Sequence, residues 1–317
     1  MTLSASGSQV PPVRAPAVAG TFYPGSPREL RRVVDGLFAA ASALPRHDED
    51  MPSVDGVPPL PLGLLVPHAG LVYSGTQAAA AWARIWTGKA GAGMTPPKVV
   101  LLGTNHRASW LDGVGIWPGG AWSTPVGHVL VDSLLAAEIL DLGGPFVESE
   151  DAHGGEHSIE VQLPLLVTVA PAARIVPLAV SAGIGDVAIE AGRRLGRLLA
   201  GRREAGDPVV LVISSDMAHY PDRTACEQAT DAQVPAIRAV DAAWLARAEG
   251  NVRRAGARGL VCGMCGIEPA VLGLAALREM GAAGGTVLAA STSADAGGPP
   301  DRTVGYLAVR FDAAPAS

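Results

Sequence analysis

Along the chain, short apolar runs alternate with longer segments of helical periodicity from residue 61 onward. Several runs are apolar almost throughout, which is typical of strands covered on both faces of a sheet. The predicted strands are 61–67, 98–104, 173–180, 208–215, 285–292 and 304–311. The predicted helices are 26–43, 75–87, 132–142, 156–170, 184–201, 228–248 and 267–281. This alternation predicts an α/β fold, a layered sandwich with a central, largely parallel or mixed sheet and helices on both faces.

The domain organisation is read from the segments outside this pattern. Residues 1–13 are polar and contain prolines, so we expect a loose N-terminal tail. A Pro- and Asp-rich connector over 43–61 precedes the first core strand. No internal repeat and no long linker near the midpoint divides the rest, so 14–317 is predicted as a single α/β domain.

Composition excludes several classes of protein. The 24 Lys and Arg residues are scattered and outnumbered by 30 carboxylates, which gives no electrostatic basis for nucleic-acid binding. No apolar stretch reaches the roughly 18–20 residues that span a bilayer, and the N-terminus lacks the apolar core of a signal peptide. Three cysteines argue against a disulfide framework. We therefore expect a cytoplasmic protein that does not enter the membrane.

Three predicted strands end in residues that carry chemistry. The first ends at His68 and the second at Asn105 and His106. The strand 208–215 is followed by Asp216 and, three residues later, by His219. Ligands of open α/β sheets bind beyond the carboxyl ends of the strands, so parallel strands would gather these side chains on one rim.

Two cysteines, Cys262 and Cys265, lie immediately before the last predicted helix, a position that favours a lowered thiol pKa. Two imidazoles and a thiolate would suit a late first-row divalent metal ion. The C-x-x-C spacing also fits a redox pair or half of a zinc site, although no second pair completes one. Buried, inert thiols are a further alternative.

The stretch 148–166 contains His153, Glu156, His157 and Glu160. Helical spacing puts His153, His157 and Glu160 near one face of a helix. These residues are interpreted either as the polar start of a helix with an apolar remainder, or as groups that orient ligands or contact substrate.

Taken together, these segments resemble the Memo family, known in bacteria as AmmeMemoRadiSam system protein B. The resemblance runs from about residue 13 to 312 and is carried by six motifs in order and spacing. They are "AVAGTFYPGSPREL", "VPHAGLVYSG", "LLGTNH", "EHSIEVQLPLL", "ISSDMAHY" and "CGIEP".

Members of this family resemble in fold the class III extradiol dioxygenases, which are non-haem iron enzymes. The resemblance implies a rim site in an α/β sandwich with His68, His106 and Cys265 as metal ligands, Cys265 because it matches "CGIEP". Cys262 is the second choice, and Glu268 is an alternative carboxylate ligand. The extradiol enzymes use a carboxylate as third ligand, so a thiolate departs from their pattern. The expected cofactor is Fe(II), with Cu or Zn as alternatives.

The resemblance also assigns roles around the metal. Asp216 and His219 match an S-S-D-x-x-H motif, which implies that His219 is a catalytic acid/base oriented by Asp216. Tyr73 and His157 are expected to line the substrate pocket.

The predicted function is that of a non-haem metal-binding protein with dioxygenase-like oxidoreductase chemistry at a His/His/Cys site. The alternative is a metal-handling protein or a peptide-binding adaptor that keeps the cleft without turnover, since vertebrate relatives are described as adaptors for phosphotyrosine peptides. The bacterial system name implies radical-SAM and AMMECR-type partner proteins, besides a small-molecule substrate that the sequence does not identify.

Overall fold

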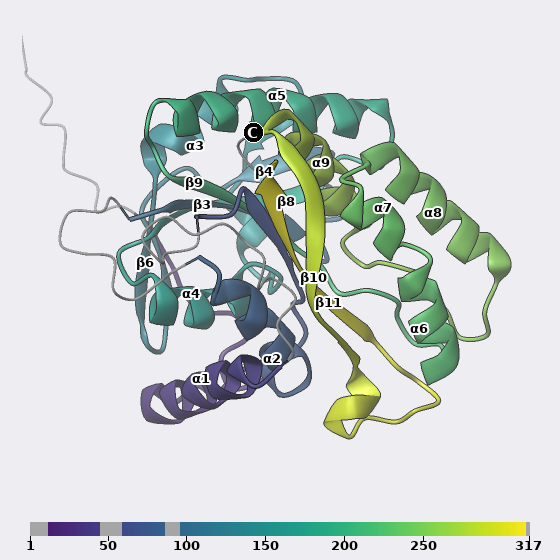
Figure 1. The fold of residues 1–317 in the computed structure, drawn as a ribbon. Helices are drawn as coiled ribbons and strands as arrows, with labels where there is room; N and C mark the ends of the chain where they lie inside the picture. Colours follow the sequence, from purple (N-terminus) through teal and green to yellow (C-terminus); the bar gives the residue numbers. More distant parts are fainter. Residues whose placement is uncertain (1–11, 45–58, 86–95, 315–317) are drawn as a thin grey trace, which may run out of the picture.

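The computed structural model describes residues 12–44, 59–85 and 96–314, whose fold is drawn in Figure 1. The strands are β1 (Val13–Arg14), β2 (Gly63–Val66), β3 (Lys98–Thr104), β4 (Gly113–Ile116), β5 (Ala121–Thr124), β6 (Gly127–Val131), β7 (Phe146–Glu148), β8 (Arg174–Ser181), β9 (Val209–Ser214), β10 (Ala282–Thr292) and β11 (Gly305–Ala313). The α-helices are α1 (Pro27–Ser42), α2 (Leu71–Trp82), α3 (Ser133–Leu140), α4 (Leu163–Val169), α5 (Asp186–Glu204), α6 (Arg223–Asp231), α7 (Val234–Arg238), α8 (Ala242–Ala255) and α9 (Ile267–Glu279). Short 3₁₀ turns are η1 (Asp151–His153), η2 (Glu160–Gln162) and η3 (Ser293–Ala296).

Within the described residues, these strands form one mixed sheet in the order β1-β5-β6-β8-β3-β9-β2-β11-β10, with β4 and β7 attached beside β8. The centre of the sheet, β8-β3-β9-β2, is parallel, and β10, β11 and β4 add antiparallel pairs. Ser214 pairs in register with both Val66 and Gly103, so β2, β3 and β9 end level at one edge. This arrangement confirms the predicted fold class and aligns the strand ends that carry the candidate residues.

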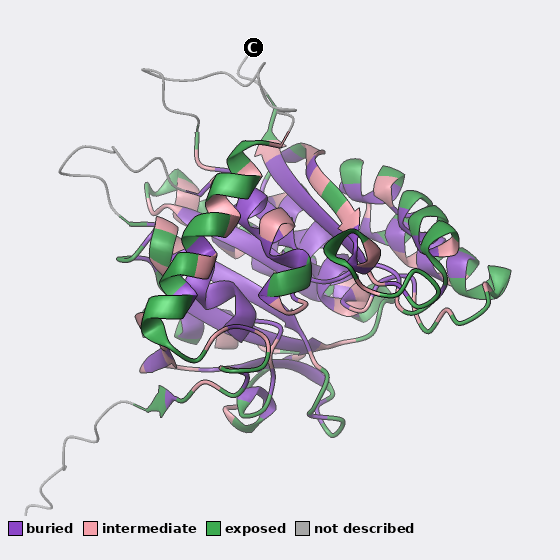
Figure 2. Cartoon of the chain, turned by 90° about the horizontal axis from the view of Figure 1, so that it is seen from below, coloured by how far each residue is buried: buried purple, intermediate pink, exposed green. Residues whose placement is uncertain are grey.

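Helices cover both faces of the sheet (Figure 1). In β3, Val99 and Leu101 face a core that includes residues of α1, α2 and α4. Val100 and Leu102 face a second core that includes residues of α3, α5, α8 and α9. Because adjacent strand residues point to opposite faces, one apolar strand serves both cores. Figure 2 shows the result, with buried strands inside and helices exposed on their outer surfaces.

Several helix boundaries differ from those predicted. Helix α2 begins at Leu71, four residues earlier than expected, because Gly70 caps it and the Leu71 N–H bonds to the Phe22 carbonyl. The helix predicted over 228–248 is instead divided among α6, α7 and α8. The break before α8 occurs at Val240, which has a φ of 52°, and Asp241 then caps the new helix.

The single helix predicted over 156–170 is wrong, since η2 and then α4 occupy this region. The Glu156 carboxylate accepts the backbone N–H groups of His157 and Ser158 and folds the chain into a tight turn. His153 and His157 therefore do not share a helix face. His153 is fully buried, with Nε2 2.9 Å from the Gly115 carbonyl.

The remaining differences from the predictions concern the short peripheral strands and the segments next to the described residues. The strands β4, β5 and β7 were not predicted, because they have three or four residues each and little continuous apolar pattern. The tail predicted over 1–13 lies mostly outside the described residues, but Val13 already belongs to β1 and pairs with Ala121. Most of the 43–61 connector also lies outside them. No helix in the described part of the chain is long and apolar enough to cross a membrane.

Candidate metal centre

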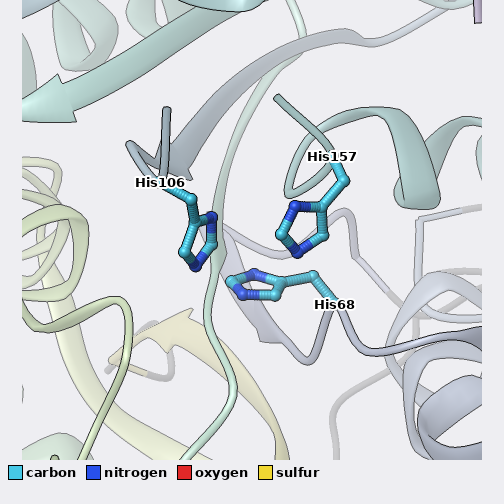
Figure 3. Close-up of side chains that lie close together, drawn as sticks. All are labelled: His68, His106 and His157. Carbon is cyan, nitrogen blue, oxygen red and sulfur yellow. The ribbon is translucent and has the colours of Figure 1, made fainter. Parts of the chain in front are cut away.

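Three histidines from separate segments meet beyond the carboxyl ends of the central strands. His68 follows β2, His106 follows β3, and His157 lies in the turn before α4 (Figure 3). The His106 and His157 rings stack with centroids 4.6 Å apart, and the His68 ring is nearly perpendicular to both, at 5.3 and 5.4 Å. One potential ligand atom from each histidine lies within 4.8 Å of the others.

A chain of buried hydrogen bonds sets the protonation of the His68 ring. The Trp82 N–H orients the Gln162 amide, whose NH₂ group donates to the Ser214 hydroxyl at 2.9 Å. That hydroxyl donates its own hydrogen to the Ser158 carbonyl at 2.7 Å. It can therefore only accept from His68 Nδ1, 3.1 Å away, so Nδ1 carries the ring proton. Nε2 is left with a lone pair, the form that binds a metal ion.

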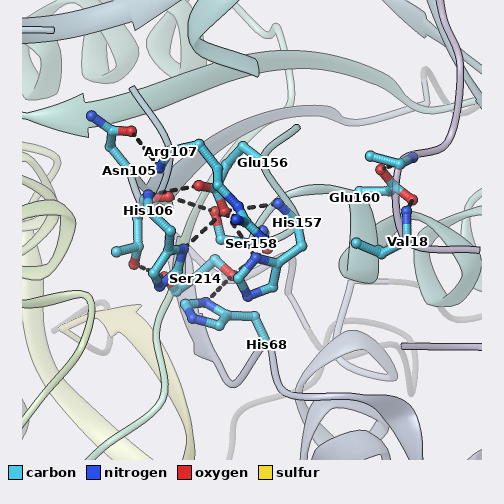
Figure 4. Close-up of polar contacts among 12 residues, drawn as sticks. Val18, His68, Asn105, His106, Arg107, Glu156, His157, Ser158, Glu160 and Ser214 are labelled. Carbon is cyan, nitrogen blue, oxygen red and sulfur yellow. Dashed lines mark hydrogen bonds and ion pairs between the residues drawn. The ribbon is translucent and has the colours of Figure 1, made fainter. Parts of the chain in front are cut away.

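Glu156 organises the other two histidines (Figure 4). Its Oε1 lies 2.9 Å from His106 Nδ1 and 3.3 Å from His157 Nδ1, and its Oε2 accepts the His106 backbone N–H at 2.7 Å. Burial acts to raise the pKa of the Glu156 carboxyl, but the hydrogen bond and charge of His106 outweigh it and lower the pKa. The ionised carboxylate holds Nδ1–H of His106, which leaves the lone pair on Nε2 of that ring available to a metal ion.

A second group of potential metal ligands consists of His68, Asp216 and Cys265, and therefore shares His68 with the group of three histidines. The Cys265 sulfur lies 3.2 Å from His68 Nε2 and accepts the Asp216 backbone N–H at 3.3 Å. The expected lowering of the thiol pKa before α9 is wrong, because burial, and then the charge of Asp216, raise the pKa of Cys265 well above its ordinary value. A metal ion bound here would have to displace the thiol proton.

The predicted ligands His68, His106 and Cys265 all lie in this region, but His106 and Cys265 fall in different groups and His68 belongs to both. Of the two cysteines before α9, only Cys265 joins a group among the described residues. Glu268, the alternative carboxylate, instead accepts the exposed Gly183 N–H at 3.0 Å.

No hydrogen bond joins Asp216 to His219 in the described part of the chain, although the charge of His219 acts on Asp216. The Asp216 Oδ1 accepts the backbone N–H groups of His68 and Ala69, at 2.7 and 3.2 Å, and so fixes the chain where His68 leaves its strand. His219 Nδ1 instead lies 2.9 Å from the Met217 carbonyl. A carbonyl only accepts, so Nδ1 carries the proton and Nε2 of neutral His219 is free to take one.

A cavity of about 620 Å³ opens over these groups. Tyr73 and His157, the residues predicted to line the substrate pocket, both line it, as do His219 and both cysteines. Sequence reasoning did not single out Phe22, Tyr220 and Arg302 in its walls. Phe22 and Tyr220 lie inside the quoted motifs "AVAGTFYPGSPREL" and "ISSDMAHY", whereas Arg302 lies in a loop with no motif.

The donor set fits a late first-row divalent metal ion. Tetrahedral N and S ligands at ordinary bond lengths are roughly 3.4–3.6 Å apart, so donors within 4.8 Å need only a small inward movement. Burial, and then the charges of His157 and His106, lower the pKa of His68 well below its ordinary value. Burial likewise lowers the pKa of His157 to about 4. Both rings are neutral near pH 7, as metal ligation requires.

The fold, together with the side chains beyond the carboxyl ends of its central strands, defines an α/β protein with a site that contains histidines and a cysteine. The family model described as "Memo-like protein" matches residues 14–310, and the chain belongs to this family. It is 33% identical over 303 residues to a MEMO1 family protein of Methanopyrus kandleri, covering 94% of this chain and 98% of the relative. A MEMO1 family protein of Aquifex aeolicus is also 33% identical over 303 residues, covering 94% and 99%. An uncharacterized protein of Escherichia coli K12, known from a crystal structure, matches with a TM-score of 0.43 and 15% identity, covering 80% of this chain and 99% of that one.

Proposed function

We propose that the protein binds a divalent transition-metal ion, Fe(II) first and Cu or Zn as alternatives, at His68, His106 and a third ligand for which Cys265 and His157 compete. The observation that carries the proposal is the orientation of the rings. Separate buried acceptors hold Nδ1 of His68 and His106, and their Nε2 atoms are left as ligands. A metal-binding histidine regularly donates the N–H of its other ring nitrogen to an acceptor in the protein.

We extend the proposal to oxidoreductase chemistry on a small molecule in the cavity above the metal. When bound, a redox-active metal ion would supply open binding positions and the capacity for single-electron transfer. His219 faces the same cavity and takes a proton from the substrate at Nε2, while the Met217 carbonyl holds its Nδ1–H. Phe22 lines the same cavity, with its ring centroid 4.6 Å from that of His157, and this apolar ring helps to exclude water beside the site.

The test is metal binding by protein purified without oxygen. The wild type should hold about one Fe(II) per chain, and His68→Ala and His106→Ala should each lose it. His128→Ala is the matched control, because His128 is exposed on β6 and outside both ligand groups. Absence of specific metal binding in the wild type, or equal binding in all four proteins, would contradict the proposal.

Metal handling without turnover is the second candidate function, because it needs the same two groups of potential ligands but no proton transfer at His219. His219→Gln separates the two. If the protein turns over a substrate, this variant keeps its metal and loses rate; if it only stores metal, retention and release are unchanged. A peptide-binding adaptor would bind its target equally well after His68→Ala.

A further inference from the structure

We propose that the mouth of the cavity contains an anion-binding subsite formed by Arg302 on the ring of Tyr220, and that the substrate is an aromatic carboxylate. This inference rests on the proposed function, because it names the class of molecule that would reach the metal. The carboxylate would bind at Arg302 and the ring would extend toward the histidines.

The aromatic part of the proposal comes from the walls of the cavity. Its lining includes the rings of Phe22, Tyr73, Tyr220 and Tyr306 in addition to the histidines. A cavity of about 620 Å³ lies within the ordinary size of small-molecule sites. Aromatic walls favour a flat, largely apolar ligand, because rings pack well against one another in offset or edge-to-face arrangements.

The anionic part comes from Arg302, the one Lys or Arg among the described residues that line the cavity. Its guanidinium carbon lies 4.3 Å from the centroid of the Tyr220 ring, and its side chain has no hydrogen bond or ion pair with any described residue. Arg223, by contrast, is paired with Glu227 and Asp295. Stacking occupies the face of a guanidinium and leaves its N–H edges free for a carboxylate. A single cation suits a monoanion better than a phosphate dianion.

The loop that carries Arg302 is held in place before any ligand arrives. At one end, Thr292 and Asp295 form a capping box around η3, and Asp295 accepts from Arg223 at 2.7 Å. The Ser293 hydroxyl accepts the Val304 N–H at 3.0 Å and ties the two ends together. A cation on a fixed loop loses less entropy on binding than one on a mobile loop.

Tyr220 is held just as firmly, in a backbone conformation that tyrosine rarely adopts. Its φ is 73°, its N–H donates to the Thr303 carbonyl at 2.7 Å, and its ring centroid lies 5.3 Å from that of His219. A Cβ at Gly259 would approach the Tyr220 carbonyl to 2.7 Å, so a glycine is needed to permit the turn. Strain of this kind persists where contacts impose it, and it is concentrated at binding sites.

The test compares two probes that differ mainly in charge, 4-fluorobenzoate and 4-fluorobenzamide, titrated against the protein by ¹⁹F NMR. In metal-free wild type, the benzoate should bind about fivefold more tightly than the amide, the upper range for an exposed ion pair. Arg302→Gln should abolish this preference. Arg107→Gln is the control, because Arg107 is exposed and its charge acts on His157, but it does not line the cavity.

Two results would overturn the inference. One is a preference for benzoate that survives in Arg302→Gln, and the other is a preference that appears only in Zn(II)-loaded protein, which would place the carboxylate on the metal. Metal content is measured on the same samples, so that failure of the proposed function is seen separately. A chain that binds no metal yet loses its benzoate preference in Arg302→Gln would refute the metal proposal and retain the subsite.

Discussion

Glu156 binds His106 twice, through both oxygens of one carboxylate. Oε1 lies 2.9 Å from the ring Nδ1, and Oε2 accepts the backbone N–H at 2.7 Å (Figure 4). The first contact orients the imidazole, and the second fixes the chain that carries it. Because the same carboxylate also accepts the His157 N–H, it couples two of the three histidines.

This arrangement predicts that Glu156→Gln weakens metal binding without removing any candidate ligand. The amide oxygen can still accept one hydrogen bond, but the negative charge that holds Nδ1–H of His106 is lost. Fe(II) affinity, measured by anaerobic competition with a chelator, should fall about 10–100-fold. Glu148→Gln, on an exposed position of β7, is the control. An affinity equal to that of wild type would mean that Glu156 serves folding alone.

The third ligand can be assigned by comparing sulfur with imidazole. If Cys265 is the ligand, Cys265→Ala should lower Fe(II) affinity by more than about a hundredfold. This loss exceeds the one expected for a residue that only hydrogen-bonds to a ligand. Cys262→Ala is the matched control, because Cys262 lines the cavity but joins neither ligand group. A large loss in His157→Ala, with Cys265→Ala unchanged, would instead assign the three histidines.

The sequence predicted the central part of the fold because its strands are strongly apolar. Strands β3 and β9 matched the predicted segments closely, since burial on both faces demands a continuous apolar run. The ends of β2 and β3 also brought His68 and His106 to one edge of the sheet. The peripheral strands β4, β5 and β7 were missed because they are too short, at three or four residues each, to give a continuous apolar run.

Contacts that depend on tertiary structure could not be predicted. The role of Glu156 requires that a turn rather than a helix follow His153, and the sequence pattern favoured the helix. Likewise, nothing local indicates that Asp216 would bond to the backbone of His68, which is 148 positions away, rather than to His219. Arg302 lacks any periodic or motif context and is recognised only by the cavity around it.

A buried ion pair ties the N-terminal segment to η2, which follows the turn that carries His157. Arg14 donates to Glu160 at 2.7 Å, and Glu160 also accepts from the Tyr23 hydroxyl at 2.6 Å. Arg14→Met should lower the free energy of unfolding by about 3–5 kcal/mol, because it leaves a buried carboxylate without its cation. The measurement is urea denaturation of metal-free protein.

The double variant Arg14→Met/Glu160→Gln tests the cause of that loss. Removing the unpaired charge should recover part of the lost stability, since the amide oxygen still accepts from Ala17, Val18 or Tyr23. A double variant less stable than Arg14→Met alone would show that the Glu160 carboxylate stabilises the fold through its hydrogen bonds from Ala17, Val18 and Tyr23 even without its cation.

Stability should fall below neutral pH through His153, which is buried away from the candidate ligands. Burial lowers the pKa of His153 to about 4, although the hydrogen bond to Gly115 acts in the opposite direction. The unfolded chain takes up a proton near pH 6.5, whereas the folded chain does so only near pH 4, so acid favours unfolding across this interval. Once the pH is low enough to protonate His153 in the folded chain too, the resulting loss in the free energy of unfolding reaches about 3 kcal/mol.

His153→Gln removes this titration and can still donate to the Gly115 carbonyl. The wild type minus variant difference in unfolding free energy, measured on metal-free protein at pH 7.5 and again at pH 4, isolates His153 from the other buried histidines. We expect the wild type to lose more stability than the variant by about 2–3 kcal/mol over this interval. His128→Gln should lose as much unfolding free energy as the wild type between the two pH values, because His128 is exposed. If His153→Gln also loses as much unfolding free energy as the wild type, His153 takes up a proton in the folded state as readily as in the unfolded chain.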